Sequence, residues 1–421
     1  MCQTLLSFPQ QARNGFDACQ GTTDMAKKTV RDLTDLQGKR VLVRVDFNVP
    51  LDEHGVITND RRIRAALPTL KLLLDGGASC IVMSHLGRPT GDPEKDAKLR
   101  MDGIAERLRQ LISVPIHIAP EVIGKDVNAL VQSLRPSEIL ILQNLRFHPG
   151  EQKGDTAFAR ELAELADVYV NDAFGTCHRS DASMAAVPAA MKGKPRVVGL
   201  LVAKELEVLG QLLEHPKRPV VGLLGGAKVS DKIGFIKKML SIVDQVLIGG
   251  AMTYTFMLAK GQSIGQSKAE KDKVELAKEL IKLGGNKLIL PQDHLIANQP
   301  HANSQTKIAE GNIPEGWYGM DIGPKTIAAY QTILKDAGTI VWNGPMGKYE
   351  EEPFATGTKA MAETLAQCAG ITIVGGGETA EAVEEFQLDA AMNHVSTGGG
   401  AFLEYVEGTP FKALMEIDDV H

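Results

Sequence analysis

Short apolar runs typical of buried strands alternate with longer helical patterns along almost the whole chain. Strands separated by helices are joined by crossover connections, so this order predicts parallel sheets with helices packed on both faces. In the first half of the chain the expected strands are Arg40–Val45, Cys80–Met83, Pro115–Ile118, Ile139–Leu142, Val168–Val170 and Arg196–Val198. In the second half they are Val220–Leu224, Gln245–Ile248, Lys287–Leu290, Thr339–Trp342, Ile371–Val374 and His394–Val395.

A long amphipathic segment at residues 199–215 separates the two halves, and Pro216 follows it, where a helix should end. We therefore expect two Rossmann-like three-layer α/β/α domains with mainly parallel sheets, joined by a long interdomain helix. The expected boundaries are 25–198 for the N-terminal domain, 216–404 for the C-terminal domain and 405–421 for a tail. Residues 1–24 show neither a regular period nor a signal-peptide pattern, and we interpret them as a disordered leader or the product of a wrong start codon.

The overall composition excludes several classes of protein. The 421 residues carry a net charge of −6, whereas a general nucleic-acid binder should show a strong basic excess. No apolar run reaches the roughly 18–20 residues needed to cross a bilayer. The five cysteines are scattered without CxxC spacing, so we expect free thiols in a reducing cytoplasm and neither a disulfide nor a zinc framework.

The stretch Arg218–Gly234, RPVVGLLGGAKVSDKIG, lies near the midpoint of the chain. Its pattern predicts a buried strand, a sharp turn at Gly225 and Gly226, and a helix start that carries Lys228 and Lys232. Free backbone N–H groups, the helix dipole and ammonium charge would meet there, which favours a site for anionic oxygen. A tight turn with solvated lysines is the alternative that this stretch alone leaves open.

Basic, amide and acidic side chains follow the expected strands of the first half. The carboxyl ends of parallel strands share one edge of a sheet, where ligands collect, so we expect these side chains to gather there. They are Asp46, Asn48, Arg62, His85, Arg88, Arg146, His178 and Arg179. Guanidinium groups bind carboxylate and phosphate oxygens bidentately, so the pattern predicts a pocket for a small, multiply anionic molecule. Any one of these arginines taken alone would more often form a surface salt bridge.

Glycine turns follow the expected strands of the second half, at 225–226, 249–250, 344, 375–377 and 398–400. Such turns let a ligand lie against the backbone with its phosphates on N–H groups. The chain has no P-loop motif, and no acidic residue closes the strand after GGGETA, which argues against a dinucleotide-dependent dehydrogenase. We therefore expect a nucleoside phosphate, with Lys228 and Lys232 on phosphates, Glu350 on ribose and Glu378 on Mg²⁺, an ion that needs only one or two protein carboxylates.

Several segments together resemble the phosphoglycerate kinase family. They are RVDFNVP, RRIRAALP, SHLGRP, NLRF, DAFGTCHR, GGAKVSDKI, MDIGPKT, WNGPMG and STGGGAFLE, and the resemblance extends from about Lys39 to Gly408. It implies a two-domain enzyme of glycolysis or gluconeogenesis that reversibly moves the acyl phosphate of 1,3-bisphosphoglycerate to MgADP, giving 3-phosphoglycerate and MgATP. It also implies small-molecule substrates without nucleic-acid or membrane partners, a cytoplasmic monomer, and a tail that packs back toward the N-terminal domain.

Matched residue by residue, the resemblance assigns roles to individual positions. For 3-phosphoglycerate it implies Asp46, Phe47, Asn48, Arg62, His85, Leu86, Gly87, Arg88, Arg146 and Arg179. For the nucleotide it implies Lys232, Gly250, Gly323, Glu350, Gly376, Gly377, Glu378 and Thr379, with Glu378 as the metal ligand. For the phosphoryl group in transfer it implies the catalytic residues Arg62, Lys228, Gly399 and Gly400.

The chain departs from the family's usual pattern at a few positions. Glu378 stands where the family usually has Asp, Gln143 where it has Glu, Asp181 where it has His, and Lys348-Tyr349 where it has Val-Phe. None of these changes replaces a site arginine or lysine, so the expected reaction class stands. The longer Glu378 side chain bears on metal affinity and nucleotide preference, and a non-catalytic nucleotide-binding protein on the same fold is the alternative.

The expected mechanism needs no general base. The acyl phosphate is already activated and the attacking ADP oxygen carries no proton to remove, so positioning and charge neutralisation suffice. The arginine pocket and the glycine-lysine pocket belong to different sheets. The domains must therefore close, with the 199–215 helix and neighbouring loops as the hinge, and closure expels water.

Overall fold

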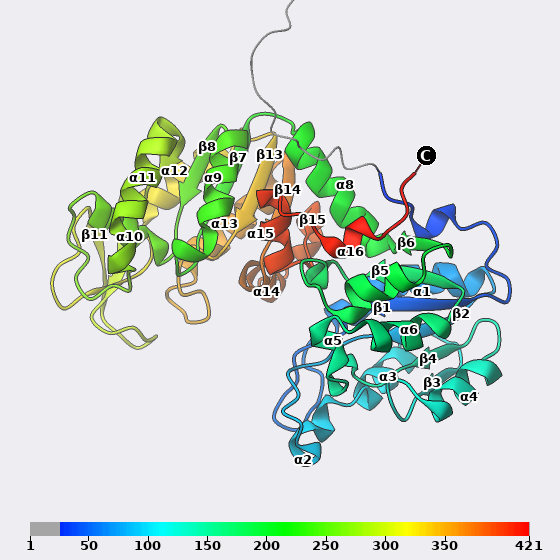
Figure 1. Cartoon of the computed structure of the whole chain (residues 1–421). Coiled ribbons are helices and arrows are strands. Elements are labelled where there is room, and N and C mark those ends of the chain that lie inside the picture. Colours follow the sequence, from blue (N-terminus) through cyan, green and yellow to red (C-terminus); the bar gives the residue numbers. More distant parts are fainter. Residues whose placement is uncertain (1–25, 421) are drawn as a thin grey trace, which may run out of the picture.

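A computed structural model describes residues 26–420, and it contains two domains that are each built on a six-stranded sheet (Figure 1). The N-terminal sheet has the order β3-β4-β2-β1-β5-β6, and all neighbouring strands are parallel. Its strands are β1 (Arg40–Val45), β2 (Ser79–Met83), β3 (Ile116–Ile118), β4 (Ile139–Ile141), β5 (Val168–Asp172) and β6 (Arg196–Val198). Strands β2, β4 and β5 are buried at every residue, because helices cover both faces of the sheet.

The C-terminal sheet has the order β15-β14-β13-β7-β8-β9 and is also parallel throughout. Its strands are β7 (Val220–Leu224), β8 (Gln245–Ile248), β9 (Leu288–Ile289), β13 (Thr339–Asn343), β14 (Ile371–Gly375) and β15 (His394–Val395). The α/β class with parallel sheets that the sequence predicted is therefore confirmed.

A small antiparallel sheet in the C-terminal half was not predicted. It has the order β11-β10-β12, formed by β10 (Asp293–Ala297), β11 (Thr306–Glu310) and β12 (Tyr318–Ile322). Four of the five residues of β11 are exposed, so its sequence contains no apolar run of the kind that marks the buried parallel strands.

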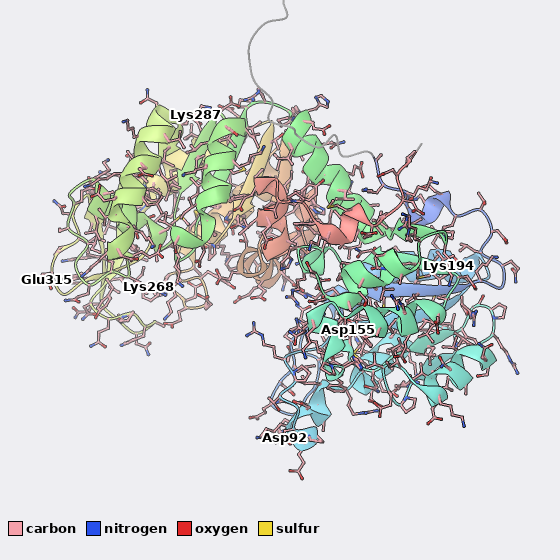
Figure 2. The ribbon with its side chains drawn as sticks, viewed as in Figure 1. Asp92, Asp155, Lys194, Lys268, Lys287 and Glu315 are labelled. Carbon is pink, nitrogen blue, oxygen red and sulfur yellow. The ribbon has the colours of Figure 1, made fainter. Side chains whose placement is uncertain are left out.

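Helices cover both faces of the two large sheets (Figure 1). In the N-terminal half they are α1 (Arg61–Asp75), α2 (Pro93–Asp96), α3 (Asp102–Arg109), α4 (Lys125–Ser133), α5 (Gly150–Lys153), α6 (Thr156–Glu164) and α7 (Val187–Ala190). In the C-terminal half they are α9 (Ile233–Ile242), α10 (Met252–Ala259), α11 (Val274–Gly284), α12 (Pro324–Lys335), α13 (Thr356–Gln367), α14 (Gly377–Glu385) and α15 (Gly400–Glu407). Charged side chains project from the loops between the elements, as Figure 2 shows for Asp92, Lys268 and Glu315.

Helix α8 (Leu200–Glu214) leads from the last strand of the first sheet to the first strand of the second. The helix is one residue shorter at each end than the predicted 199–215, because Gly199 is extended and His215 lies beyond the last turn. One face of α8 packs on α1 and on the edge formed by β5 and β6. No helix among residues 26–420 is both long and apolar enough to cross a membrane.

The C-terminal tail, which includes α16 (Lys412–Met415), lies against the edge of the N-terminal sheet. The Asp418 N–H donates to the carbonyl of Arg196 in β6 over 2.9 Å, and the Lys28 N–H donates to the carbonyl of Asp418 over 2.8 Å. Lys27 and Asp419 form an ion pair of 2.7 Å beside them. The two ends of the described chain therefore meet at β6, while the leader expected at residues 1–24 falls outside the described residues.

Candidate active site

An ion pair stands at the carboxyl end of β1. Asp46 is the first residue after the strand and Arg62 lies in the first turn of α1, where its Nη1 donates to Asp46 Oδ2 over 2.7 Å. Arg62 keeps 37% of its side-chain surface exposed, so the ion pair leaves guanidinium edges free for a ligand. Phe47 is fully buried, its N–H donates to Ser84 Oγ and its carbonyl accepts from the Val49 N–H, so its backbone is already held by internal partners.

The loop after β2 is held in place by side chains from two other strand ends. The Gly87 N–H donates to Asn48 Oδ1 over 2.8 Å, and the Gly87 carbonyl accepts from Arg146 Nη1 over 2.7 Å. Gly87 has φ +59°, which favours glycine, and the neighbouring Leu86 side chain is buried. Arg88 is exposed at the end of the same loop. The sequence-predicted residues of this loop are thus brought together with Asn48 and Arg146.

His85 is buried beneath this edge and contacts Arg44, which the sequence reasoning missed. Arg44 Nη2 lies 3.3 Å from His85 Nδ1, and because a guanidinium can only donate, Nδ1 accepts and the ring proton is on Nε2. Burial lowers the pKa of His85, and the positive charges of Arg44, Arg146, Arg179 and Arg62 add to that effect. His85 is therefore neutral. A charged residue inside an otherwise apolar strand was the available signal for Arg44.

Four side chains at this edge hold polar atoms that are buried and lack a hydrogen-bond partner among residues 26–420. They are Arg146 Nε, His178 Nδ1, Arg179 Nη1 and Asp181 Oδ2, and Asp172 Oδ2 at the end of β5 is a fifth such atom. Buried polar groups are nearly always paired, so unpaired guanidinium donors side by side fit an anionic ligand. The sequence prediction of an anion pocket rests on the same arginines.

Glycines bring the strand-end turns of the C-terminal sheet into contact with one another. Gly226 has φ +96°, Gly250 φ +64° and Gly344 φ +96°, and a Cβ on Gly250 would lie 2.4 Å from the Gly226 nitrogen. Lys232 reaches across these turns, and its Nζ donates to the carbonyls of Gly225 (2.8 Å) and Asn343 (3.2 Å). Burial lowers the pKa of Lys232 to about 8, although Glu378 and Asp231 act in the opposite direction.

The helix after the Gly225-Gly226 turn starts later than predicted. Lys228 lies in an irregular segment, Ser230–Lys232 forms one 3-10 turn, and α9 begins at Ile233. The carboxylate of Glu270 fixes the first residue of this turn, accepting from the Ser230 N–H (3.0 Å) and Ser230 Oγ (2.5 Å). Lys228 is exposed and forms no side-chain hydrogen bond or ion pair within the described part of the chain.

Two helices begin at the same sheet edge. Helix α14 begins after Gly376, which has φ +94°, and α15 begins after Gly399, which has φ +52°. A Cβ added to Gly377, Gly399 or Gly400 would meet no atom of residues 26–420 within 4 Å, so both helix starts have room for a ligand. Glu378 is exposed in the first turn of α14, which places a carboxylate at this edge.

Other residues expected at the nucleotide have structural partners. Thr379 Oγ1 accepts the Gly344 N–H over 2.6 Å, and a Cβ on Gly323 would lie 2.3 Å from Asp293 Cγ. The internal contacts of this edge therefore require Thr379 and Gly323 whether or not a nucleotide is bound. Glu350 is exposed after β13.

Tyr349 shows that the two glutamates expected at the nucleotide lie in one region. Burial raises the pKa of Tyr349 to about 12, and the charges of Glu350 and Glu378 are among those that raise it further. The carboxylates expected at the ribose and at the metal therefore act on the same side chain.

The two strand-end edges approach each other beside α8. A Cβ on Gly175, after β5, would lie 2.9 Å from Asp46 Oδ2 and 3.0 Å from the carbonyl oxygen of Thr397. Glu205 of α8 is buried, and it accepts from the Thr397 N–H over 2.7 Å and contacts His394 Nε2 at 2.7 Å. The loop that leads to Gly399 is thus attached to the interdomain helix. An acidic residue on the apolar face of the 199–215 helix was the missed signal for Glu205.

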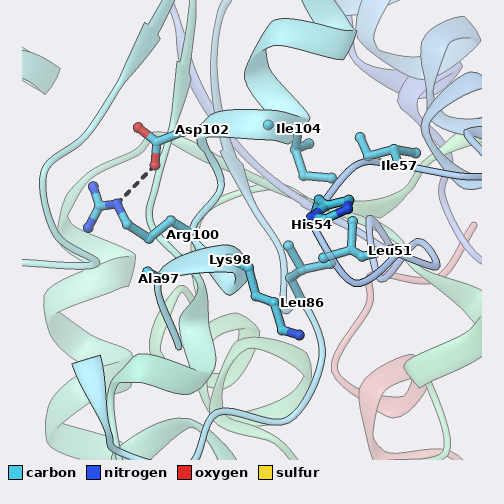
Figure 3. Close-up of a pocket in the computed structure, with 11 residues that line it drawn as sticks. Leu51, His54, Ile57, Leu86, Ala97, Lys98, Arg100, Asp102 and Ile104 are labelled. Carbon is cyan, nitrogen blue, oxygen red and sulfur yellow. Dashed lines mark hydrogen bonds and ion pairs between the residues drawn. The ribbon is translucent and has the colours of Figure 1, made fainter. Parts of the chain in front are cut away.

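A separate small cavity lies behind the loop after β2 (Figure 3). Leu51, Ile57, Leu86 and Ile104 line it, and the Arg100–Asp102 ion pair stands at its rim. His54 and Lys98 also line it, and Leu86 is the one residue that this cavity shares with the arginine edge among those described.

Two parallel α/β domains, one with an arginine-rich edge and the other with a glycine-lysine edge, define a two-domain phosphotransferase. Residues 30–409 match the family model for phosphoglycerate kinase. The chain therefore belongs to the phosphoglycerate kinase family, as its motifs predicted.

Relatives and solved structures agree with this family. The chain is 53% identical over 399 residues to phosphoglycerate kinase of Rhodopirellula baltica and 48% identical over 399 residues to that of Moorella thermoacetica, and each match covers 94% of this chain and 100% of the relative. Its fold is similar to phosphoglycerate kinase from Coxiella burnetii (TM-score 0.82, 37% identity, 93% of this chain and 98% of that one). It is also similar to the enzyme from Pyrococcus horikoshii OT3 (TM-score 0.80, 29% identity, 92% and 98%).

The family's activity is the reversible transfer of a phosphoryl group between 1,3-bisphosphoglycerate and ADP, a step of glycolysis, and this is the activity of the chain. ATP and ADP are co-substrates, and the other substrates are small molecules. The family match argues against the two alternatives, a non-catalytic nucleotide-binding protein and a dehydrogenase.

Proposed function

We propose that the arginine edge of the N-terminal domain binds 3-phosphoglycerate and the acyl end of 1,3-bisphosphoglycerate. The observation that carries this proposal is the pair of unpaired buried donors on Arg146 and Arg179, with the unpaired His178 Nδ1 beside them. Neutral His85, with its proton on Nε2, donates one more hydrogen bond without adding charge. Asp46 and Asn48 orient Arg62 and the backbone of the loop after β2.

The glycine-lysine edge of the C-terminal domain binds the nucleotide. Lys232 holds its phosphates, and Lys228, which has no competing partner among the described residues, follows the phosphoryl group between the two substrates. The N–H groups at the start of α15, at Gly399 and Gly400, face the same oxygens. Gly250, Gly376 and Gly377 let the nucleotide lie close to the backbone, with Glu350 on the ribose, and Gly323 and Thr379 hold the shape of this edge.

The lowered pKa of Lys232 predicts that nucleotide binding depends on pH. Free Lys232 loses its proton above pH 8, and the bound phosphate restores it, so MgADP affinity should fall about tenfold between pH 7.5 and 9. Binding at pH 9 should also take up a proton, which titration calorimetry in buffers of different ionisation enthalpy measures. Lys232→Arg stays charged and should remove the pH dependence. A wild-type affinity that is flat across this range would contradict the assignment.

Glu378 fits a Mg²⁺ ion that the nucleotide also binds. No three His, Cys, Asp or Glu side chains in residues 26–420 form a group able to hold a metal by themselves, and Mg²⁺ is commonly bound by one carboxylate together with substrate phosphates. The exposed Glu378 carboxylate, at a helix start with free space beside it, supplies that one ligand. When bound, the ion neutralises phosphate charge, and Lys232 and Glu378 keep the phosphates at the sheet edge.

We expect turnover to require Mg²⁺ and Glu378. Glu378→Gln should raise the half-saturating Mg²⁺ concentration by about tenfold or more, since it removes the charge and keeps the shape. Glu378→Asp should retain much of the wild-type response. Glu381→Gln, which changes an exposed glutamate one turn later in α14, is the matched control. Equal rates with Mg²⁺ and with excess chelator would exclude a metal role for Glu378.

The domains close around α8 to bring the two substrates into line. Positive charge from Arg62 on one domain and Lys228 on the other then faces the oxygens of the moving phosphoryl group, without a general base. Gly175, Thr397 and Glu205 already lie where the two edges approach, which supports a hinge at this point. Residues 25–198 form the substrate domain, 199–215 the interdomain helix, 216–404 the nucleotide domain and 405–421 the tail.

A coupled assay with 3-phosphoglycerate and MgATP tests this assignment, and a parallel run with MgGTP measures nucleotide preference. We also propose that the protein is a cytoplasmic monomer. Light scattering should give the mass of a single chain, and fractionation should recover activity in the cytosol.

A further inference from the structure

Asp181 places a carboxylate among the arginines of the proposed substrate pocket. It is only 8% exposed, and its Oδ2 is buried without a hydrogen-bond partner in the described chain. Its negative charge acts on Arg146 and on His178. Neither the sequence motifs nor the assignment above gives it a role.

The backbone fixes the position of Asp181. It is the residue before a turn of π-helix at Ala182–Ala186, and its carbonyl accepts from the N–H groups of Met184 (3.0 Å) and Ala185 (3.1 Å). The side chain, in contrast, is not used to build the fold, since its carboxylate caps no helix and forms no ion pair among residues 26–420.

Glu151 is another buried carboxyl group near Asp181, but it is bonded within the fold. Its two oxygens accept from the Ser183 N–H (2.9 Å) and Ser183 Oγ (2.5 Å), and the charge of Arg44 acts on it from the same side. Glu151 is thus a satisfied structural group. Asp181 interacts with the charge of Arg146 but has no hydrogen bond of this kind, so its carboxylate is not tied to the fold and faces whatever enters the pocket.

We propose that Asp181 is a specificity-determining residue that lowers the affinity of the arginine pocket for the phosphate-bearing substrate and so speeds its release. Two arginines with unpaired donors would hold a phosphate dianion very tightly, and a fixed negative charge beside them repels the same ligand. If Asp181 instead held the arginines in place, it would have to bond to them, which it does not. The inference rests on the assignment of this pocket to 3-phosphoglycerate.

The full-length enzyme tests the inference by titration calorimetry with 3-phosphoglycerate. Asp181→Asn and Asp181→Ser both remove the charge, and each should bind 3-phosphoglycerate about five- to tenfold more tightly at low salt, with a smaller gain at high salt. Asp181→Glu should restore wild-type affinity. The KM for 3-phosphoglycerate should fall in the neutral variants, while MgADP affinity stays unchanged. Glu161→Gln removes an exposed charge on α6 and is the control for net charge.

Arg146→Ala distinguishes an error in the role of Asp181 from an error in the assignment of the pocket. If it weakens 3-phosphoglycerate binding while both neutral Asp181 variants bind no more tightly than the wild type, the role of Asp181 is wrong and the pocket assignment stands. If Arg146→Ala and the Asp181 variants all leave binding unchanged, the pocket itself is misassigned and the inference falls with it. Thermal melting of each variant identifies any that fail to fold, and two neutral substitutions keep the test decisive.

Discussion

Lys228→Ala is expected to lower turnover by about 10²–10³-fold or more while ADP still binds. Lys228 is exposed and makes no side-chain hydrogen bond among the described residues, so its ammonium group is free to act on the phosphoryl group in transfer. Lys232, in contrast, is partly buried and bonded to two carbonyls at the strand ends, and it keeps the nucleotide phosphates in place when Lys228 is absent.

The measurement for Lys228 is kcat in the coupled assay together with the ADP dissociation constant. Lys237→Ala, which removes an exposed lysine of α9 in the same domain, is the matched control and should behave like the wild type. Retention of more than about a tenth of wild-type turnover in Lys228→Ala would remove this residue from the reaction centre.

Arg62→Ala, in the N-terminal domain, should lower turnover by a similar factor. Its guanidinium is fixed by Asp46 at 2.7 Å and is still more than a third exposed, so it is both oriented and available to the transferring group. Loss of this positive charge should reduce kcat/KM for 3-phosphoglycerate by about 10²–10³-fold, mainly through kcat, since such donors act on charge that develops in the transition state.

Arg64→Ala provides the control for Arg62, because Arg64 lies in the same turn of α1 but is exposed and pairs with Asp60. We expect it to change kcat/KM by less than about twofold, as is usual for surface ion pairs. An Arg62→Ala enzyme that loses only substrate affinity and keeps its kcat would show that Arg62 binds the ground state and does not stabilise the transition state.

Much of the fold could be predicted because buried parallel strands and their connections leave strong patterns. Strand β7 is a continuous apolar run and β1 is apolar apart from Arg40 and Arg44, and both strands begin and end at the predicted residues. The exposed β11 leaves no such run, and the antiparallel sheet was therefore missed. The late start of α9 was also missed, and the contact that fixes Ser230 just before it comes from Glu270, 40 residues away.

The sequence alone determined which kinds of side chain meet at the arginine edge and at the glycine-lysine edge. Parallel strands have all their carboxyl ends on one side, so arginines that follow the strands of one sheet must share an edge, and so must glycine turns that follow the strands of the other. The tertiary structure alone decided which of these groups are already committed to internal partners. Lys232 is bonded to Asn343, 111 positions away, whereas Lys228 has no such bond and Asp181 Oδ2 has no hydrogen bond among the arginines. Those differences arise from contacts between distant segments, and no local pattern of residues encodes them.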